Sequence, residues 1–102
     1  MTRNFTLTLD AADDTLAIWE FIAADESERI ADKVIARIYD ECEKLGATPG
    51  IGHFREDLIS KDFKFWRVWS YLIVYRWQAT PIQVIAVVHG ARNLSAFLRR
   101  RG

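Results

Sequence analysis

The sequence predicts an α+β fold: an N-terminal strand, an antiparallel helical hairpin, a three-stranded antiparallel sheet (β-αα-βββ) and a short C-terminal helix. Three observations predict this class. Apolar residues alternate with polar ones over residues 3–9, and they recur at helical spacing over residues 11–45. Three β-branched and aromatic runs follow between residues 63 and 89. The simplest packing of these elements covers one face of the sheet with the helical hairpin.

The first two elements are predicted from residues 3–24. In the alternating segment, Phe5, Leu7 and Leu9 fall on one face, which is typical of a half-buried strand. Asp10 is the candidate N-cap of a helix over residues 11–24, because its carboxylate can accept the free N–H groups of the first turn. The apolar stripe of this helix consists of Leu16, Ile18, Trp19, Ile22 and Ala23.

A second helix is predicted over residues 27–45, where apolar residues step by three and four positions. These residues are Ala31, Ile35, Ile38, Cys42 and Leu45. Gly46 is a typical helix stop, and Pro49 lies just beyond it. Because only a short polar break separates the two helices, we expect an antiparallel hairpin.

The C-terminal strands are predicted at residues 63–69, 72–77 and 82–89, after a loop over residues 46–62. The first strand places Phe63, Phe65, Arg67 and Trp69 on one face, and Lys64, Trp66 and Val68 on the other. The last strand is apolar almost throughout, so we expect both of its faces to be covered.

The chain is expected to end in a short helix near residues 93–101, with Leu94, Phe97 and Leu98 on one side. Residues 79–81 predict a turn, as do Ser70 and Tyr71 before the second strand. No repeat or low-complexity linker interrupts the chain, so we expect a single domain over residues 1–102.

The charge distribution favours a protein that binds a partner. The 102 residues carry no net charge, but residues 1–28 have a net charge of −6 and residues 53–102 have a net charge of +6. No apolar run approaches the ~20 residues of a membrane span. The N-terminus lacks the features of a signal peptide, and one cysteine excludes an internal disulfide. We therefore expect a cytoplasmic protein that is not associated with a membrane.

Most catalytic motifs are absent from the sequence. Gly50 and Gly52 lie in a loop without the strand–turn–helix setting of a phosphate site, so they indicate a turn. His53 and His89 alone cannot complete a zinc site, and Cys42 lies on the apolar stripe of the second helix. We expect no metal and no cofactor.

One group of side chains could still support chemistry. It consists of Arg67, Arg76, His89 and Arg92, on or just after the three C-terminal strands. Arginine and histidine together can hold a phosphate and transfer a proton, as metal-free RNA cleavage requires. The same residues also fit solvated charges at the rim of a sheet, and both interpretations stay open at this point.

Four stretches of the sequence resemble the ParE toxins of the RelE/ParE superfamily, which belong to type II toxin–antitoxin modules. The first stretch, LDAADDTLAIWEFIA at 9–23, is similar to the first helix of that family. Leu45 with PGIG at 49–52 and Arg55 resembles its loop. The third is YLIVYR at 71–76, and the fourth is VVHGARNL at 87–94, with Val87 where the family often has Arg and Asn93 where it often has Asp.

This resemblance implies a RelE/ParE-like fold and a bacterial toxin that inhibits growth and takes part in plasmid stabilisation. A cognate, ParD-like antitoxin would neutralise it within a hetero-oligomer. ParE-like members are held to inhibit DNA gyrase, whereas RelE-like relatives cleave mRNA on the ribosome. In the RNases the strand corresponding to 71–75 usually has Arg as its second residue, and Leu72 stands there in this chain. The chain is also neutral, whereas an RNA target favours a basic protein.

The resemblance therefore favours a gyrase inhibitor that acts by binding, without catalytic residues and without direct sequence-specific contact to nucleic acid. One alternative is a metal-free, ribosome-dependent endoribonuclease that uses Arg76, His89 and Arg92. Another is a non-toxic family member that only binds its antitoxin. Trp66 and Trp69 fall on opposite faces and cannot both be buried in one core. One of them either anchors a partner or is covered by the helices or the C-terminal tail, and both interpretations stay open. The predicted surface for the antitoxin or the target consists of Arg67, Trp69, Arg76, Arg92, Arg99 and Arg100.

Overall fold

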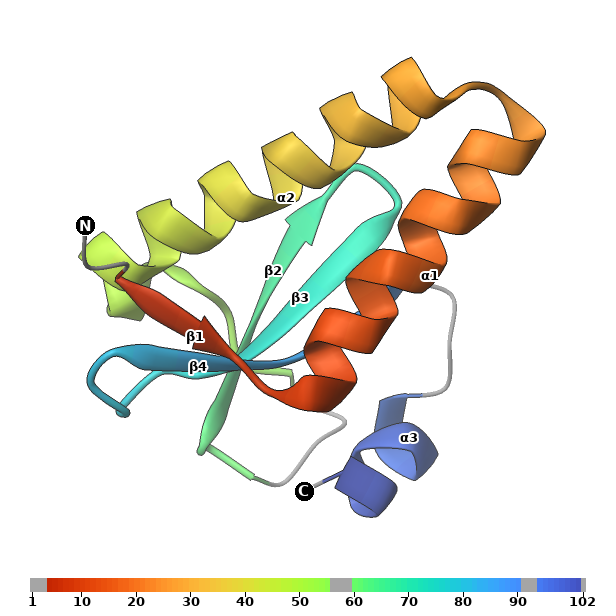
Figure 1. Cartoon of the computed structure of the whole chain (residues 1–102). Coiled ribbons are helices and arrows are strands. Elements are labelled where there is room, and N and C mark those ends of the chain that lie inside the picture. The colour runs from red at the N-terminus through yellow and green to blue at the C-terminus, as the bar shows by residue number, and fades with distance from the viewer. Residues whose placement is uncertain (1–3, 56–59, 91–93, 102) are drawn as a thin grey trace.

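A computed structural model describes residues 4–55, 60–90 and 94–101 (Figure 1). The elements are β1 (Phe5–Leu7), α1 (Leu9–Asp25), α2 (Glu28–Ala47), the short 3₁₀ helix η1 (Pro49–Ile51), β2 (Phe63–Val68), β3 (Tyr71–Arg76), β4 (Ile82–His89) and α3 (Leu94–Arg101). The predicted α+β class and the predicted order of elements are confirmed.

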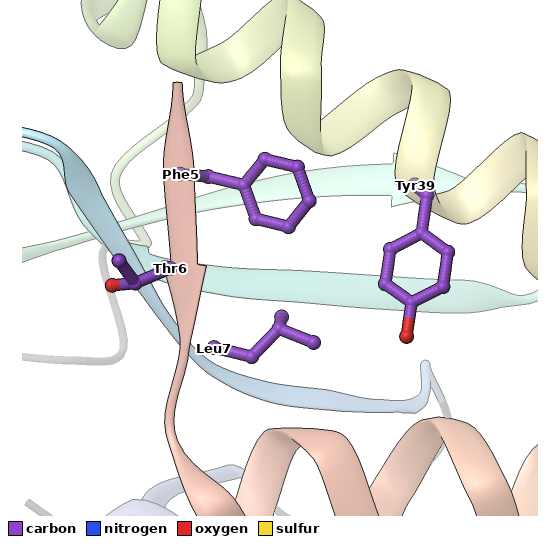
Figure 2. Close-up of a pocket in the computed structure, with 4 residues that line it drawn as sticks. All are labelled: Phe5, Thr6, Leu7 and Tyr39. Atoms are coloured by element: carbon purple, nitrogen blue, oxygen red, sulfur yellow. The ribbon is translucent and has the colours of Figure 1, made fainter. Parts of the chain in front are cut away.

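The four strands form one sheet in the order β1-β4-β3-β2. Strands β2, β3 and β4 are antiparallel neighbours, as predicted, and β1 adds to β4 in parallel. Phe5 and Leu7 of β1 point toward Tyr39 of α2, while Thr6 points away from it (Figure 2). The N-terminal strand therefore brings its apolar face under the helical hairpin.

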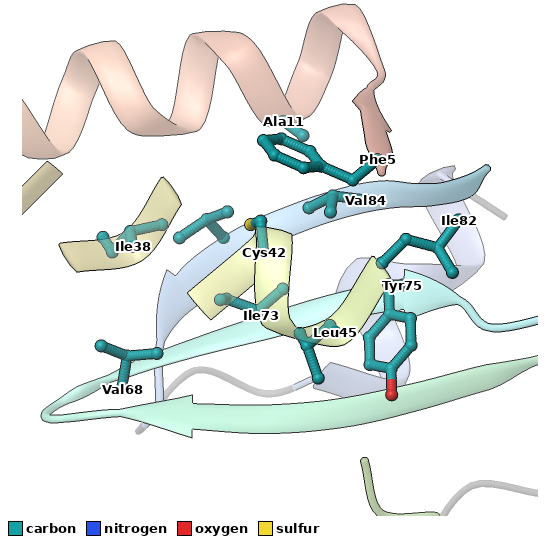
Figure 3. Close-up of a cluster of buried hydrophobic side chains, with 11 residues drawn as sticks. Phe5, Ala11, Ile38, Cys42, Leu45, Val68, Ile73, Tyr75, Ile82 and Val84 are labelled. Atoms are coloured by element: carbon teal, nitrogen blue, oxygen red, sulfur yellow. The ribbon is translucent and has the colours of Figure 1, made fainter. Parts of the chain in front are cut away.

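The main hydrophobic core lies between this hairpin and the sheet (Figure 3). Its buried members are Phe5, Ala11, Ile38, Cys42, Leu45, Val68, Ile73, Tyr75, Ile82, Val84 and Val87. Cys42 is fully buried there, as its place on the apolar stripe predicts. The alternation of β3 directs every second side chain into this core, and β4 follows the same pattern on either side of its register shift with β3.

A second core lies on the opposite face of the sheet, where α3 packs. Leu94 and Leu98 of α3 are buried together with side chains of all three antiparallel strands, among them Phe65, Leu72 and Val88. Both faces of β4 are therefore covered, as its apolar sequence predicts. The expectation that helices cover one face is correct for α1 and α2, and α3 extends it to the other face (Figure 1).

The start of α1 differs from the prediction. Thr8, not Asp10, is the N-cap: its hydroxyl accepts the Ala11 N–H at 3.1 Å. The helix thus begins at Leu9, which is 86% exposed, and β1 is shorter than the alternation suggested. The buried face of α1 consists of Ala11, Thr15 and Ile22, and Leu16 lies outside it with 57% exposure, so its predicted burial is wrong.

The end of α2 also differs. The helix continues through Gly46 to Ala47 and is capped by Thr48. Gly46 lies against the backbone of Asn4, and a Cβ at this position would collide with the Asn4 carbonyl oxygen. Gly46 is therefore required for the close approach of α2 to the N-terminal strand, and it does not stop the helix.

Strands β2 and β3 are joined by a two-residue loop of Trp69 and Ser70, because Val68 pairs with Tyr71. Trp69 is thus in the turn and not in the strand, which is one residue shorter than predicted. Farther along, the register between β3 and β4 shifts between Val74 and Tyr75, which face Ala86 and Val84. The carboxylate of Asp14 from α1 accepts the Val87 N–H at 3.0 Å, beyond the end of the β1 pairing.

Candidate functional site

The hairpin end of the sheet brings together three of the residues that the sequence singled out. Tyr71 of β3 lies directly opposite His89 of β4, with their ring centroids 6.1 Å apart and nearly perpendicular. Arg67 lies on the other face, where its guanidinium is so near Gly90 that a Cβ there would be 3.1 Å from Nη1. An aromatic ring, an imidazole and a guanidinium therefore surround the ends of β2, β3 and β4.

Tyr71 is half-buried beside the turn between α1 and α2. Burial, with a smaller contribution from the carboxylate of Glu26, raises the pKa of the Tyr71 hydroxyl above its ordinary value. The phenol is therefore neutral at physiological pH, and it is a hydrogen-bonding group and not an anion in this site.

Arg76 lies at the other end of the sheet. It pairs with Phe63 of β2 and Gln83 of β4, and its guanidinium stacks over the Phe63 ring at 4.8 Å. Tyr71 is the partner of His89 on β4. Arg76 lies five positions farther along β3 than Tyr71, and this spacing corresponds to ~17 Å along the strand. The structure therefore does not bring Arg76 and His89 together. Arg92, the third residue of the alternative RNase set, lies outside the described residues.

The remaining predicted cations lie on α3. Arg99 and Arg100 are exposed on the last turn of this helix, on the face of the sheet that α1 and α2 do not cover. Their position at the C-terminal end of a helix is favourable for cations, because the helix dipole is negative there. They are available to a partner, and they form a group separate from Arg67 and His89.

The two candidate tryptophans of β2 and its turn have different surroundings. Trp66 packs against the main core and donates its indole N–H to Glu41 of α2 at 2.8 Å. Trp69 is 58% exposed at the hairpin tip, and the guanidinium carbon of Arg37 lies 5.9 Å from its ring centroid. Trp69 is thus the one of the two that is accessible to a partner.

An open pocket of about 350 Å³ lies between β1 and α2 (Figure 2). It is lined by Phe5, Thr6 and Leu7 of β1 and by Tyr39 of α2. The rings of Phe5 and Tyr39 stack at 6.2 Å. Sequence reasoning did not find this pocket, because the pairing of β1 with β4 and the angle between the helices are not visible in a local pattern.

Lys64 is a second feature that the motif search missed. It is only 8% exposed, and its ammonium donates to the carbonyls of Gly50 and Gly52 at 3.3 and 3.2 Å. The rings of Phe54 and Trp77 lie 4.2 and 4.9 Å from the same nitrogen. These contacts satisfy the buried charge and fasten the loop around η1 to β2. The one sequence signal for the burial of Lys64 was the alternation of β2, which places Lys64 on the same face as the core residue Val68.

Within residues 4–55, 60–90 and 94–101, no three histidine, cysteine, aspartate or glutamate side chains gather in a way that could hold a metal ion. None of the described helices has the length and apolar character of a membrane crossing.

The model of the family described as "ParE toxin of type II toxin-antitoxin system, parDE" matches residues 5–94. The chain belongs to the ParE toxin family. This match includes the whole helical hairpin and the sheet, and it ends at the first residue of α3. The resemblance that the four sequence stretches suggested is thereby confirmed.

Solved structures agree with the ParE assignment at the level of the fold. A chain described as "Chromosomal ParDE TA system from P. aeruginosa" matches with a TM-score of 0.70 and 18% sequence identity, over 85% of this chain and 95% of that chain. A comparison with curated proteins gave no significant match. Within the ParE fold, the candidate surface thus consists of the hairpin tip with Arg67, Trp69 and His89, the arginines of α3, and the pocket of Phe5, Leu7 and Tyr39.

Proposed function

We propose that this ParE-family toxin inhibits DNA gyrase by binding to it, and that a cognate ParD-like antitoxin prevents this binding. The observation that carries the proposal is the match of the ParE toxin family over residues 5–94, since ParE-like members are held to act on gyrase. A toxin of this kind acts where DNA is replicated, so the proposal places the protein in the bacterial cytoplasm.

The geometry of the described residues supports a binding toxin over the alternative RNase. General acid–base catalysis requires the reacting groups within hydrogen-bond reach of one substrate. Arg76 and His89 lie at opposite ends of the sheet, ~17 Å apart along β3. Leu72 stands where the RNases usually have Arg, and it is buried in the second core. This position therefore supplies packing and not the cation that the RNases use.

We propose that the antitoxin covers the pocket of Phe5, Leu7 and Tyr39 with an apolar side chain. A disordered segment that folds on binding commonly places anchors of this type into preformed apolar pockets. Acidic residues of the same segment would pair with the basic C-terminal half of the toxin, including Arg76, Arg99 and Arg100. These assignments rest on the family and on the chemistry of the surface.

Measurements of DNA and protein synthesis in growing bacteria distinguish gyrase inhibition from mRNA cleavage. After induction of this chain, incorporation of labelled thymidine should stop, and cells should form filaments, while incorporation of labelled methionine continues. A gyrase inhibitor blocks replication before it affects translation. Loss of methionine incorporation before that of thymidine would contradict the proposal and would favour the RNase. Co-expression of the antitoxin should restore thymidine incorporation and prevent filament formation.

A further inference from the structure

The backbone of Trp69 has a conformation that its side chain does not favour. Its φ is +54°, and it is the only non-glycine residue of the described chain with a positive φ. In two-residue hairpin loops such positions are usually taken by glycine, asparagine or aspartate, because a bulky side chain is strained there. Trp69 also gains little from burial, since it is 58% exposed. The stability of the fold therefore does not explain a tryptophan at this position.

Two arginines contact Trp69, one at its backbone and one at its ring. Arg67 donates from Nη1 to the Trp69 carbonyl oxygen at 3.4 Å, and the guanidinium carbon of Arg37 lies 5.9 Å from the ring centroid. Both arginine side chains are exposed. Arg37 also forms an ion pair with Glu41, whose carboxylate is occupied by the indole of Trp66 as well.

The other three tryptophans use their indole N–H groups inside the protein. They donate to Asp32, to Glu41 and to the Lys61 carbonyl oxygen at 2.8 to 2.9 Å. Trp69, in contrast, lies exposed at the hairpin tip. The tip is held in place by the backbone, because the Ser70 carbonyl oxygen accepts the Gly90 N–H at 2.8 Å, just after the end of β4. Backbone strain that the surrounding structure maintains is found at functional sites.

We propose that Trp69, with Arg37 and Arg67 beside it, anchors this toxin on DNA gyrase, in a depression of the gyrase surface that carries carboxylates. Tryptophan and arginine are the residue types that contribute most to binding at interfaces, and two exposed guanidiniums select an acidic partner. This inference rests on the proposed function and names the toxin residues that contact the target.

The position of the tip favours the target over the antitoxin as its partner. The pocket proposed for the antitoxin includes Phe5, which pairs with Ile82 at the start of β4. The tip contacts Gly90, just after the end of β4. The pocket extends to Leu7, which pairs with Val84, five positions or ~17 Å of strand before His89. Its α2 residue, Tyr39, is two positions from Arg37. An apolar side chain seated against β1 in the pocket therefore does not by itself reach the Trp69 ring.

The test compares Trp69→Gly with the unchanged protein in a supercoiling assay with purified gyrase. Glycine is suited to a positive φ, so we expect a melting temperature equal to or above that of the unchanged protein. Inhibition should nevertheless require at least about tenfold more of the variant, as for a residue that dominates an interface. Trp69→Phe, which keeps an aromatic ring, should restore most of the inhibition.

Controls separate the roles of aromatic exposure, folding and charge. Phe21→Ala removes another exposed ring, 68% accessible on the acidic helix α1, and should inhibit like the unchanged protein. Arg37→Gln with Arg67→Gln should weaken inhibition and reduce its dependence on salt. If Trp69→Gly is unstable, Trp69→Asn provides the same comparison, since asparagine also tolerates this φ.

Each outcome decides between the proposals. Equal inhibition by Trp69→Gly and the unchanged protein would overturn the role of the hairpin tip and leave gyrase inhibition in place. Absence of inhibition by the unchanged protein would overturn the proposed function, and the role of Trp69 with it. Loss of inhibition in Phe21→Ala to the same extent as in Trp69→Gly would also contradict a specific role for the tip.

Discussion

The hydroxyl of Tyr75 shows how one side chain positions a loop in this fold. It donates to the Pro49 carbonyl oxygen at 2.7 Å and accepts the Gly52 N–H at 3.1 Å. Gly52 is needed here, because a Cβ at this residue would collide with the Tyr75 hydroxyl. Together with Lys64, Tyr75 attaches the loop around η1 to the sheet, next to the main core.

Replacing Tyr75 with phenylalanine should lower the free energy of unfolding by about 1–3 kcal/mol, because a buried N–H and a carbonyl lose their partner. Urea denaturation of the variant and the unchanged protein measures this difference. Phenylalanine at Tyr39, which is half-buried at the rim of the pocket, provides a comparison at a less buried site.

The same substitution should change the dependence of stability on pH. Burial raises the pKa of Tyr75, although the Gly52 N–H acts in the opposite direction. The folded state then keeps a proton that the unfolded state loses above pH ~10, so stability is constant below that pH and falls above it. Melts of the unchanged protein between pH 8 and pH 11 should fall more steeply at the alkaline end than those of Tyr75→Phe. Parallel profiles would contradict this assignment.

At the residue scale, the sequence pattern predicted side-chain faces better than backbone conformations. The alternation of β2 correctly placed Trp66 and Lys64 with Val68 on one face, because strand periodicity determines direction. It could not show that Trp69 leaves the strand with a positive φ, because this depends on the pairing of Val68 with Tyr71. It also could not show that Lys64 would be buried by residues of a distant loop.

At the scale of elements, α2 illustrates how a contact overrides a local signal. Glycine after an amphipathic stretch usually ends a helix, but α2 continues through Gly46 to Ala47. The glycine is required there because Asn4 approaches it too closely for a side chain. The acidic cap of α1 was assigned to the wrong residue for a similar reason. The chain leaves β1 immediately after pairing with Val84, so Thr8 is the residue placed to cap.

Gly46→Ala should therefore destabilise the protein. Alanine in a free helix is favoured over glycine by ~1 kcal/mol. Here the collision with Asn4 should reverse the sign, with a loss of about 1–3 kcal/mol, which is typical of overpacking. Gly50→Ala is a matched control, since a Cβ there meets no atom within 4 Å. A melting temperature of Gly46→Ala above that of the unchanged protein would contradict the close approach.

The contact between Asp14 and β4 predicts that Asp14 contributes more to stability than its neighbour Asp13. Asp14→Ala leaves the Val87 N–H without its carboxylate and should cost about 1–2 kcal/mol. Asp13→Ala removes an exposed carboxylate from the same turn of α1 and should change stability by less than about 0.5 kcal/mol. Chemical denaturation of both variants tests this, and Asp14→Asn, which keeps an acceptor oxygen, should recover part of the loss. Equal values for the two alanine variants would contradict the role of Asp14.

At the scale of the whole molecule, the sheet separates two cores and the surfaces attached to them. The acidic N-terminal half contributes α1, and the basic C-terminal half contributes β2, β3 and α3. Of the predicted binding residues, Arg67 and Trp69 lie at the hairpin tip, Arg76 at the other end of the sheet, and Arg99 and Arg100 on α3. The predicted surface is thus spread over the molecule, as the proposed binding of both an antitoxin and gyrase requires.

Local periodicity predicted the class, the order and the approximate bounds of the elements, because each depends on neighbouring residues. The parallel addition of β1 to β4 and the docking of α3 on the second face depend on contacts between distant segments. For the same reason the pocket of Phe5 and Tyr39 and the contribution of Arg37 from α2 could not be predicted. The candidate site was therefore predicted as a set of cations, without their division between the two ends of the sheet.

The most direct test of the account is a supercoiling assay with purified DNA gyrase and this protein. We expect supercoiling to be inhibited and linear DNA to accumulate when cleavage complexes are trapped with detergent and protease. Prior addition of the antitoxin should abolish both effects. Full supercoiling activity at a large molar excess of the protein, with no linear DNA, would contradict gyrase as the target, and cleavage of ribosome-bound mRNA would then be the reaction to measure.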